Sequence, residues 1–402
     1  MGFLDTSTRI ASLTDEEIIA QLQGHHPPTE SEKNVWAFWD SGLSNCPAWC
    51  QRNVVSWVRR LSPSWTVRFL DNVPGSPNNH SNFVPTEYLP ESFAANNQTL
   101  KNDPQPGPHV SDLVRLPLLY LYGGVWMDVS FILFRNLDGL CWDVLADPAR
   151  KEEMSGFCVS FGPPSPDTLT AFFNGFIAAR RHNLCVKLWN ETSLAVWKGT
   201  DNTLGMHKHE LLRHLPRYES PGQRSPYKYE VYVDYISQMI CLERLRHVKD
   251  QKTGWDGPAY FGKGGKVLLF DCVSEVYWAQ RLTMWNGGKQ LELLATSTDP
   301  DVAGKEKYEE AKAFVDGILA MSSTMKFSSG LKVPGIEYIA TLWNKPENKG
   351  KDNAEGTFAA ELRRASVDFE QKKELTSVEM LVNESVVLVG NVLEVVGEPR
   401  AI

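Results

Sequence analysis

The stretch from Ser111 to Asp128, SDLVRLPLLYLYGGVWMD, constrains the fold of this chain more than any other. Leucines and a tyrosine recur in it at helical spacing, which predicts a helix with Ser111 as its N-cap. Two glycines then permit a tight reversal, and a short apolar run predicts a buried strand that ends on Asp128. Because open α/β sheets bind ligands at the carboxyl ends of their strands, we expect Asp128 at a ligand site.

Asp112 and Arg115 lie three residues apart, on one face of the first turn of the predicted helix. The glycine turn brings this pair and Asp128 toward one point from opposite sides. Taken singly, each residue has an ordinary explanation, either as an exposed helix pair or as a turn residue after a core strand. The joint pattern of spacing, glycines and acids instead indicates a functional site.

The same stretch resembles S-D-x-x-R-x-x-x-L-x-x-x-G-G-x-x-x-D-x-D, the sugar-donor signature of the family-32 glycosyltransferases, the capsular polysaccharide synthesis proteins and the large glucosylating bacterial toxins. The chain departs from it at the last position, where Ser130 replaces the second aspartate of D-x-D. Pro117 is also unusual, since it would kink or shorten the helix. The matching residues are Ser111, Asp112, Arg115, Leu119, Gly123, Gly124 and Asp128.

Upstream of this stretch, residues 34–39 predict a first strand, residues 47–61 an amphipathic helix and residues 65–71 a second strand. A helix between two strands is a βαβ unit, which predicts a parallel sheet with a right-handed crossover. The resemblance therefore implies an α/β fold of the GT-A type, a Rossmann-like, mostly parallel sheet flanked by helices, with helical additions at the C-terminus.

The expected organisation is an N-terminal arm at residues 1–33, a catalytic domain at 34–290 and a C-terminal helical extension or lid at 291–402. Thr14 and Glu17 form a capping box that predicts a short helix in the arm. Other expected elements are a long loop at 72–110 with a short helix near 88–95, strands at 129–134 and 156–161, a long helix at 166–188, a flexible linker at 344–356 and a strand or docking helix at 386–396.

Charge and composition limit the partners and the compartment. The net charge of −8 argues against nucleic acid, which requires a basic surface. Seven scattered cysteines, of which Cys46 and Cys50 lie close together without a second pair, indicate reduced thiols. The N-terminus lacks the charged and apolar regions of a signal peptide, and no run of ~18 apolar residues predicts a transmembrane helix. We therefore expect a cytoplasmic protein, with peripheral membrane contact left open.

The resemblance also assigns roles to residues around the predicted donor site. Trp39, the last aromatic residue of the first strand, would stack on the nucleotide base, although a core position explains it equally well. Asp112 would accept hydrogen bonds from hydroxyls of the donor sugar. Arg115 would bridge sugar and phosphate with its planar guanidinium. Asn174 is a further candidate, close to the leaving group or the acceptor.

A divalent cation, Mn²⁺ or Mg²⁺, is expected to bridge the diphosphate oxygens of the donor, because hard cations prefer carboxylate oxygen. Asp128 and Ser130 are its predicted protein ligands. Ser130 is the weaker of the two, which puts the affinity for metal in doubt. Residues 326–329 (KFSS) are the segment in which we would look for a further ligand.

The predicted function is transfer of a hexose from a nucleotide-diphosphate sugar to a hydroxyl of a small-molecule, lipid or glycan acceptor. UDP-sugars are favoured as donors and GDP-mannose comes next, and the resemblance implies retention of anomeric configuration. A same-face mechanism is favoured, because the sequence offers no obvious carboxylate nucleophile. Two alternatives remain: a scaffold with little or no activity, motivated by Ser130, and a nucleotide-sugar hydrolase that uses water as acceptor.

Overall fold

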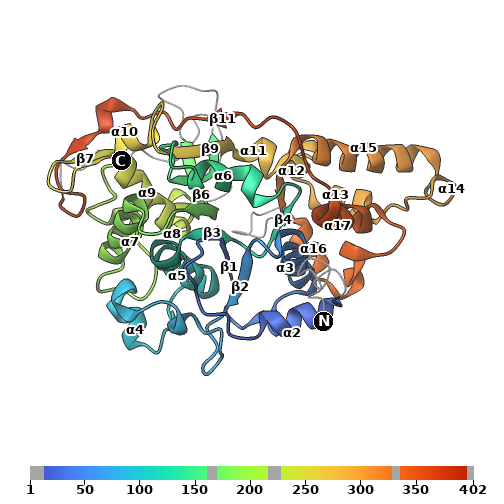
Figure 1. Cartoon of the computed structure of the whole chain (residues 1–402), viewed down its shortest axis with the longest axis horizontal. Helices are drawn as coiled ribbons and strands as arrows, with labels where there is room; N and C mark the ends of the chain where they lie inside the picture. Colours follow the sequence, from blue (N-terminus) through green and yellow to red (C-terminus); the bar gives the residue numbers. More distant parts are fainter. Residues whose placement is uncertain (1–12, 161–169, 216–227, 328–335, 396–402) are drawn as a thin grey trace, which may run out of the picture.

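A seven-stranded sheet, ordered β11-β9-β5-β6-β3-β1-β2, forms the centre of the computed structural model (Figure 1). β1 (Asn34–Phe38) is paired in parallel with β2 (Thr66–Leu70) on one side and with β3 (Gly124–Met127) on the other. The predicted βαβ unit is therefore confirmed. The structure describes residues 13–160, 170–215, 228–327 and 336–395.

The other half of the sheet mixes strand directions. β5 (Met154–Ser160) is parallel to β9 (Val267–Asp271), whereas β6 (Thr170–Ala179) is antiparallel to both β5 and β3. The edge strand β11 (Ser377–Val378) is antiparallel to β9. Five strands thus point in one direction and two in the other, so the mostly parallel sheet that the sequence predicted is confirmed.

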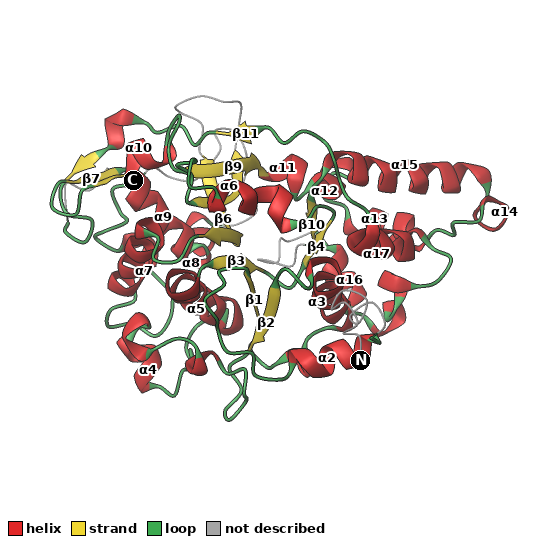
Figure 2. Cartoon of the chain, viewed as in Figure 1, coloured by secondary structure: helices red, strands yellow, loops and turns green. Residues whose placement is uncertain are grey.

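Two hydrophobic cores fill the two faces of this sheet. Successive side chains of a strand point to opposite faces, and Val35 of β1 accordingly belongs to one core and Trp36 to the other. Figure 2 shows helices on both sides of the strands. The first face packs against α3 (Ala48–Leu61) and α17 (Phe358–Asp368), and the second against α5 (Pro106–Tyr122), α7 (Leu184–Val196) and α9 (Ser237–Arg246).

The remaining elements are mostly short. Two smaller sheets lie outside the central one. The first pairs β10 (Thr324–Lys326) with β4 (Phe131–Leu133), and the second joins β12 (Leu388–Val389), β7 (Val248–Asp250) and β8 (Trp255–Asp256). The other helices are α2 (Asp15–Leu22), α4 (Glu91–Ala95), α6 (Asp143–Ala146), α8 (Tyr229–Tyr235), α10 (Gly257–Phe261), α11 (Cys272–Glu275), α12 (Trp278–Leu282), α13 (Gly287–Ala295), α14 (Pro300–Ala303), α15 (Lys305–Met321) and α16 (Ile339–Trp343).

The prediction that Ser111 is the N-cap of the central helix is wrong. α5 begins at Pro106, whose fixed φ suits the first turn of a helix, and Ser111 lies further along the helix. Pro117 does not end the helix either, because α5 continues to Tyr122. The strand that follows the glycine turn, and that delivers Asp128 at its carboxyl end, is as predicted.

The predicted helix at 166–188 is also wrong. Residues 170–179 form strand β6, and residues 166–169 lie outside the described part of the chain. The segment TAFFNGFIAA is apolar along nearly its whole length, a pattern that buried strands and buried helices share. Pairing with β3 on one side and β5 on the other selects the strand. α7 follows only at Leu184, with Asn183 as its N-cap.

The predicted flexible linker at 344–356 is an ordered part of the structure. It contains the 3-10 turns Pro346–Asn348 and Lys351–Asn353, and the side chain of Asp352 is buried. Asp352 pairs with Arg363 at 3.0 Å and with Arg52, whose Nη2 lies 2.5 Å from Oδ1. Glycine, proline and charge predict a loop locally, but they do not reveal ion-pair partners far along the chain.

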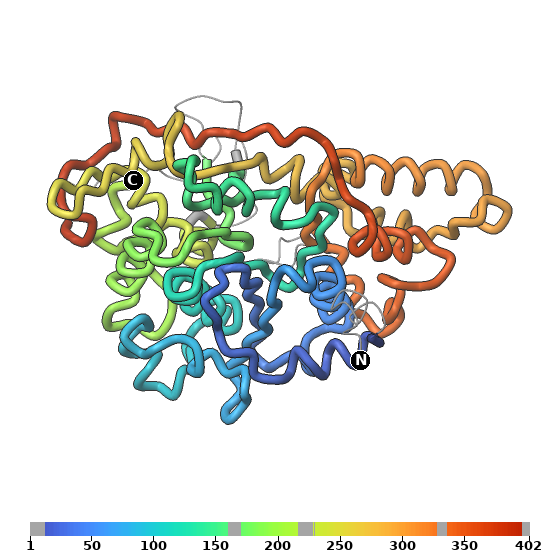
Figure 3. The backbone as a smooth tube through the Cα atoms, viewed as in Figure 1, coloured from blue at the N-terminus to red at the C-terminus, as the bar shows by residue number. Residues whose placement is uncertain are grey.

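Both segments that flank the predicted catalytic domain pack into its first core. The capping box of Thr14 and Glu17 is confirmed at the start of α2, and Ile18 of α2 shares a core with Val35. Phe314 of α15 joins the same core. Beyond α17 the chain runs back across the molecule, where it adds β11 and then β12 (Figure 3). The domain boundaries themselves stay a prediction.

Throughout the described ranges, every helix falls short of the length or the apolarity that crossing a bilayer requires.

Replacing Gly124 by alanine should destabilise the fold. Gly124 has φ +105°, and a Cβ there would lie 2.3 Å from the carbonyl oxygen of Asn34 at the start of β1. We expect Gly124→Ala to lower the free energy of unfolding by about 2 kcal/mol or more in urea titrations. Gly139→Ala is the matched control, because nothing lies within 4 Å of its Cβ position. Equal stability of the two variants would contradict this assignment.

Candidate active site

The carboxyl ends of β1 and β3 lie side by side, because the register of the two parallel strands pairs Trp36 with Trp126. Trp39 directly follows β1 and Asp128 directly follows β3, so both reach the same edge of the sheet. Trp39 is half-buried and packs partly against the first core. The backbone at Trp39 is held by a hydrogen bond from its amide to the carbonyl of Leu70.

Arg115 lies between the two predicted acids. Its Nη2 is 2.9 Å from Oδ1 of Asp112 and 3.7 Å from Oδ1 of Asp128, and only 5% of its side chain is exposed. The guanidinium also lies over the ring of Trp126, 4.9 Å from the ring centre. The structure therefore brings together the three residues that spacing placed on either side of the glycine turn.

Neighbouring backbone and side chains fix the orientation of Arg115 and Asp112. Arg115 donates to the carbonyl of Asn174 and to the hydroxyl of Ser111, both at 2.7 Å. Asn174 in turn donates to Oδ1 of Asp112 at 3.2 Å and to Oε1 of Gln238 at 3.0 Å. Asn174 thus contacts the site, although from a strand and not from the predicted helix.

Gln238 was not identified from the sequence. It comes from α9, where its side-chain amide donates to the backbone carbonyl of Asp112. A single glutamine in a helix gives no signal of such a role, because the contact joins residues that are 126 positions apart.

A second partner of Asp128 was likewise missed. Lys326 in β10 places its Nζ 2.6 Å from Oδ2 of Asp128, while Trp126 donates to Oδ1 at 3.1 Å. Residues 326–329 are the segment in which the sequence predicts a further metal ligand. Lys326 places a cationic side chain at the start of this segment, and Ser328 and Ser329 lie outside the described residues. The expected metal ligand therefore stays a prediction.

The two acids differ in their electrostatic surroundings. Burial raises the pKa of Asp128, but the charges of Lys326 and Arg115 outweigh it and hold the pKa below its usual value. Burial also raises the pKa of Asp112, and there the opposing charges of Arg115 and His109 leave it above its usual value. Asp128 is therefore the more firmly ionised of the pair.

His109 is the second positive group that acts to lower the pKa of Asp112, besides Arg115. It lies one turn earlier on α5, buried, with Nδ1 2.6 Å from Oδ1 of Asp103. Burial lowers the pKa of His109, but the hydrogen bond to Asp103 and the charge of Asp112 raise it overall. His109, Asp112 and Arg115 thus follow one another at three-residue intervals along α5.

The residues described around Asp128 fit a divalent cation poorly. Asp128 is already in contact with Lys326 and Arg115, and Ser130 is a buried neutral residue. Among the residues that the structure describes, no group of three or more His, Cys, Asp or Glu side chains is arranged to hold a metal ion. Hard cations need several oxygen ligands, which this set of side chains does not offer.

Comparisons with known proteins show the family to which this chain belongs. The family described as "Capsular polysaccharide synthesis protein" matches residues 5–207. Glycosyltransferase afumC of Aspergillus fumigatus is 54% identical over 98% of this chain and 99% of its own length. O-glycosyltransferase braB of Annulohypoxylon truncatum is 43% identical over 96% and 91%, and O-glycosyltransferase PaGT of Phomopsis amygdali is 37% identical over 91% and 89%.

A solved structure, the PaToxG Glycosyltransferase, is also similar, with 15% identity and a TM-score of 0.28 over 48% of this chain and 69% of that chain. This likeness is too distant to bear on the site. The family match spans half of the sequence, and the three relatives align over nearly all of it. The chain therefore belongs to the capsular polysaccharide synthesis protein family of glycosyltransferases.

Proposed function

We propose that this protein transfers a hexose from a UDP-sugar to a hydroxyl of a small acceptor, with retention of anomeric configuration. GDP-mannose is the second candidate donor. The observation that carries the proposal is the position of Arg115 between Asp112 and Asp128, at the carboxyl edge of parallel strands, in a member of this family. That edge is where α/β sheets bind nucleotides.

Each end of such a donor has a candidate partner. Trp39 offers an aromatic face for the base beside the edge of β1. Asp112, fixed by Asn174 and Arg115, offers carboxylate oxygens to sugar hydroxyls. Arg115 carries a planar guanidinium suited to phosphate oxygens, and its near-complete burial strengthens such a contact.

The proposed reaction breaks the bond between C1 of the sugar and the diphosphate oxygen, which keeps the electron pair. The acceptor oxygen then bonds to C1 from the same face, and its proton passes to the departing diphosphate. Asp112 and Asp128 are both engaged by Arg115, which makes either a poor nucleophile. This arrangement supports a same-face route over a covalent glycosyl-enzyme.

For the acceptor, we propose an apolar molecule that carries a hydroxyl. A series of contacting aromatic rings, here called the ring path, runs from Lys326 through Phe173 and Tyr277 to Trp285. Met284 and Trp285 are exposed at 85% and 38%, and both have positive φ, which non-glycine residues rarely adopt. This exposed apolar turn, which the ring path connects to Lys326, offers a contact surface for an apolar acceptor.

The alternative is a scaffold that binds nucleotide or glycan without turnover. Ser130 in place of an aspartate and the contact of Lys326 with Asp128 are the specific observations that favour it. The intact contacts of Asp112 and Arg115 favour the enzyme.

Nucleotide release tests the proposal directly. Purified protein is incubated with UDP-glucose, UDP-galactose, UDP-N-acetylglucosamine or GDP-mannose, with and without panels of apolar alcohols and of sugars. We expect release from one donor, faster with apolar alcohols, and a loss of roughly 100-fold in Asp112→Asn and Asp128→Asn because charge contacts disappear. Asp143→Asn, an exposed acid on α6, is the matched control. Donor binding without any release would instead support the scaffold.

Replacing Trp39 should weaken nucleotide binding. Base stacking on an aromatic side chain contributes roughly 1–3 kcal/mol, so Trp39→Ala should raise the Kd for UDP about tenfold or more in calorimetric titrations. Trp39→Phe keeps a ring at this position and should bind nearly as the parent protein does. An unchanged Kd in Trp39→Ala would mean that Trp39 has a packing role only.

The dependence of kcat/KM on pH should reveal the protonation of Asp112. Protonation removes acceptor capacity from this carboxylate, so activity falls as pH falls through its pKa. Because the pKa of Asp112 is raised, the acidic limb of kcat/KM should lie above 3.8, the ordinary value for the group. Circular dichroism across the same range establishes that the protein stays folded. A limb at or below that value would show that Asp112 is not the group that titrates.

A further inference from the structure

We propose that the ammonium group of Lys326 supplies the positive charge that a divalent metal provides in D-x-D sites, so that the donor diphosphate binds without metal. This inference rests on the proposed function. It gives one explanation for two features of the same site, the replacement of the second aspartate by Ser130 and the contact between Lys326 and Asp128.

Contacts with Asp128 and two aromatic rings hold the Lys326 side chain in place. Its Nζ lies 2.6 Å from Oδ2 of Asp128, and 12% of the side chain is exposed. The ammonium lies 5.3 Å from the ring centre of Phe131 and 5.5 Å from that of Phe173, close enough for cation–π attraction. Little conformational entropy then remains to be lost when a phosphate group meets it.

The backbone at Lys326 is fixed by strand pairing. β10 is antiparallel to β4, with Lys326 opposite Phe131, three residues after Asp128. The Lys326 amide donates to the carbonyl of Val276 at 3.2 Å, and its carbonyl accepts from Gln280 at 2.7 Å. The next amide, of Phe327, donates to the carbonyl of Ser130 at 3.0 Å. Lys326 is therefore tied to the segment that carries the altered D-x-D motif.

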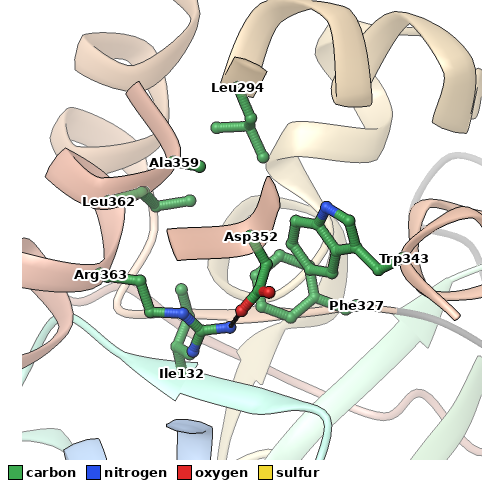
Figure 4. A pocket seen from close by; sticks show the side chains of 8 residues that line it. All are labelled: Ile132, Leu294, Phe327, Trp343, Asp352, Ala359, Leu362 and Arg363. Carbon is green, nitrogen blue, oxygen red and sulfur yellow. Dashed lines mark hydrogen bonds and ion pairs between the residues drawn. The ribbon is translucent and has the colours of Figure 1, made fainter. Parts of the chain in front are cut away.

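The C-terminal helices anchor this strand through Phe327. The Phe327 ring lies 4.7 Å from that of Trp343 and 5.9 Å from the guanidinium of Arg363, which also pairs with Asp352 at 3.0 Å (Figure 4). These residues line a cavity of only about 10 Å³, so the ring is closely enclosed. Arg363 also donates to Asn53, whose amide donates to the carbonyl of Val129 at 2.8 Å.

Formal charge supports the replacement. Two carboxylates and one divalent cation sum to zero, and so do one carboxylate and one lysine. A diphosphate that approaches Asp128 therefore meets the same total charge in either arrangement. A divalent ion added to the observed site would instead face Lys326 and Arg115, both within 4 Å of the Asp128 carboxylate, and it would be repelled.

In the reaction, Lys326 would donate hydrogen bonds to the diphosphate oxygen from which C1 departs. That oxygen gains the electron pair of the broken bond, and the nearby ammonium stabilises the added negative charge. The lysine keeps its proton throughout, and the acceptor proton passes to the diphosphate. No additional reactant is needed.

The test is calorimetric titration of UDP and of UDP-glucose into the whole protein, once with a chelator and once with Mn²⁺. We expect the parent protein to bind with the same Kd in both, and Lys326→Met to bind at least tenfold more weakly in both. Lys326→Arg keeps a cation and should retain metal-independent binding. Lys345→Met removes a surface lysine that pairs with Glu337, and it should behave as the parent. Thermal unfolding establishes that each variant is folded.

A double variant makes the test sharper. Ser130→Asp combined with Lys326→Met recreates two acids without the lysine, and it should bind UDP in Mn²⁺ but not in chelator. Binding by the parent protein only with Mn²⁺, or unchanged binding by Lys326→Met, would overturn the role of Lys326 and leave the transferase proposal standing. If the parent protein binds none of UDP, UDP-glucose, GDP and GDP-mannose under either condition, both proposals fail.

Discussion

The ion pairs of Arg115 are the interaction on which the site depends. A nearly buried guanidinium is costly unless its charge and its N–H groups are satisfied, and here Asp112, Asp128, Ser111 and the carbonyl of Asn174 satisfy them. These partners come from α5, β3 and β6, so the contact requires the sheet order that sets β6 beside β3. Fold and site are therefore specified together.

The glycine turn makes this arrangement possible by allowing close backbone approach. At Gly124 the chain comes so near the start of β1 that a side chain would collide with the Asn34 carbonyl. The close contact sets β3 in register with β1, and the register brings Asp128 level with the end of β1. The glycines of this short signature thus serve the packing of the strands, and its acids serve the chemistry of the site.

The C-terminal part of the chain completes the site from a distance. Lys326 reaches Asp128 from β10, and Phe327 holds that strand against Trp343 and Arg363. Arg363 also reaches the segment that follows Asp128, through Asn53, whose amide donates to the carbonyl of Val129. The helices after the sheet therefore help to set the charge at the donor edge, besides covering one face of the core.

The βαβ start, the glycine turn, and the meeting of Asp112, Arg115 and Asp128 could all be predicted from the sequence, because they follow from local periodicity and short spacing. Tertiary structure alone decided that residues 170–179 pair as a strand, that Asp352 is buried against arginines, and that Gln238 and Lys326 enter the site. An apolar run suits a buried helix or strand equally, and only its neighbours choose between them. Ion pairs between residues about 200 positions apart depend on how the whole chain packs, and no local pattern records them.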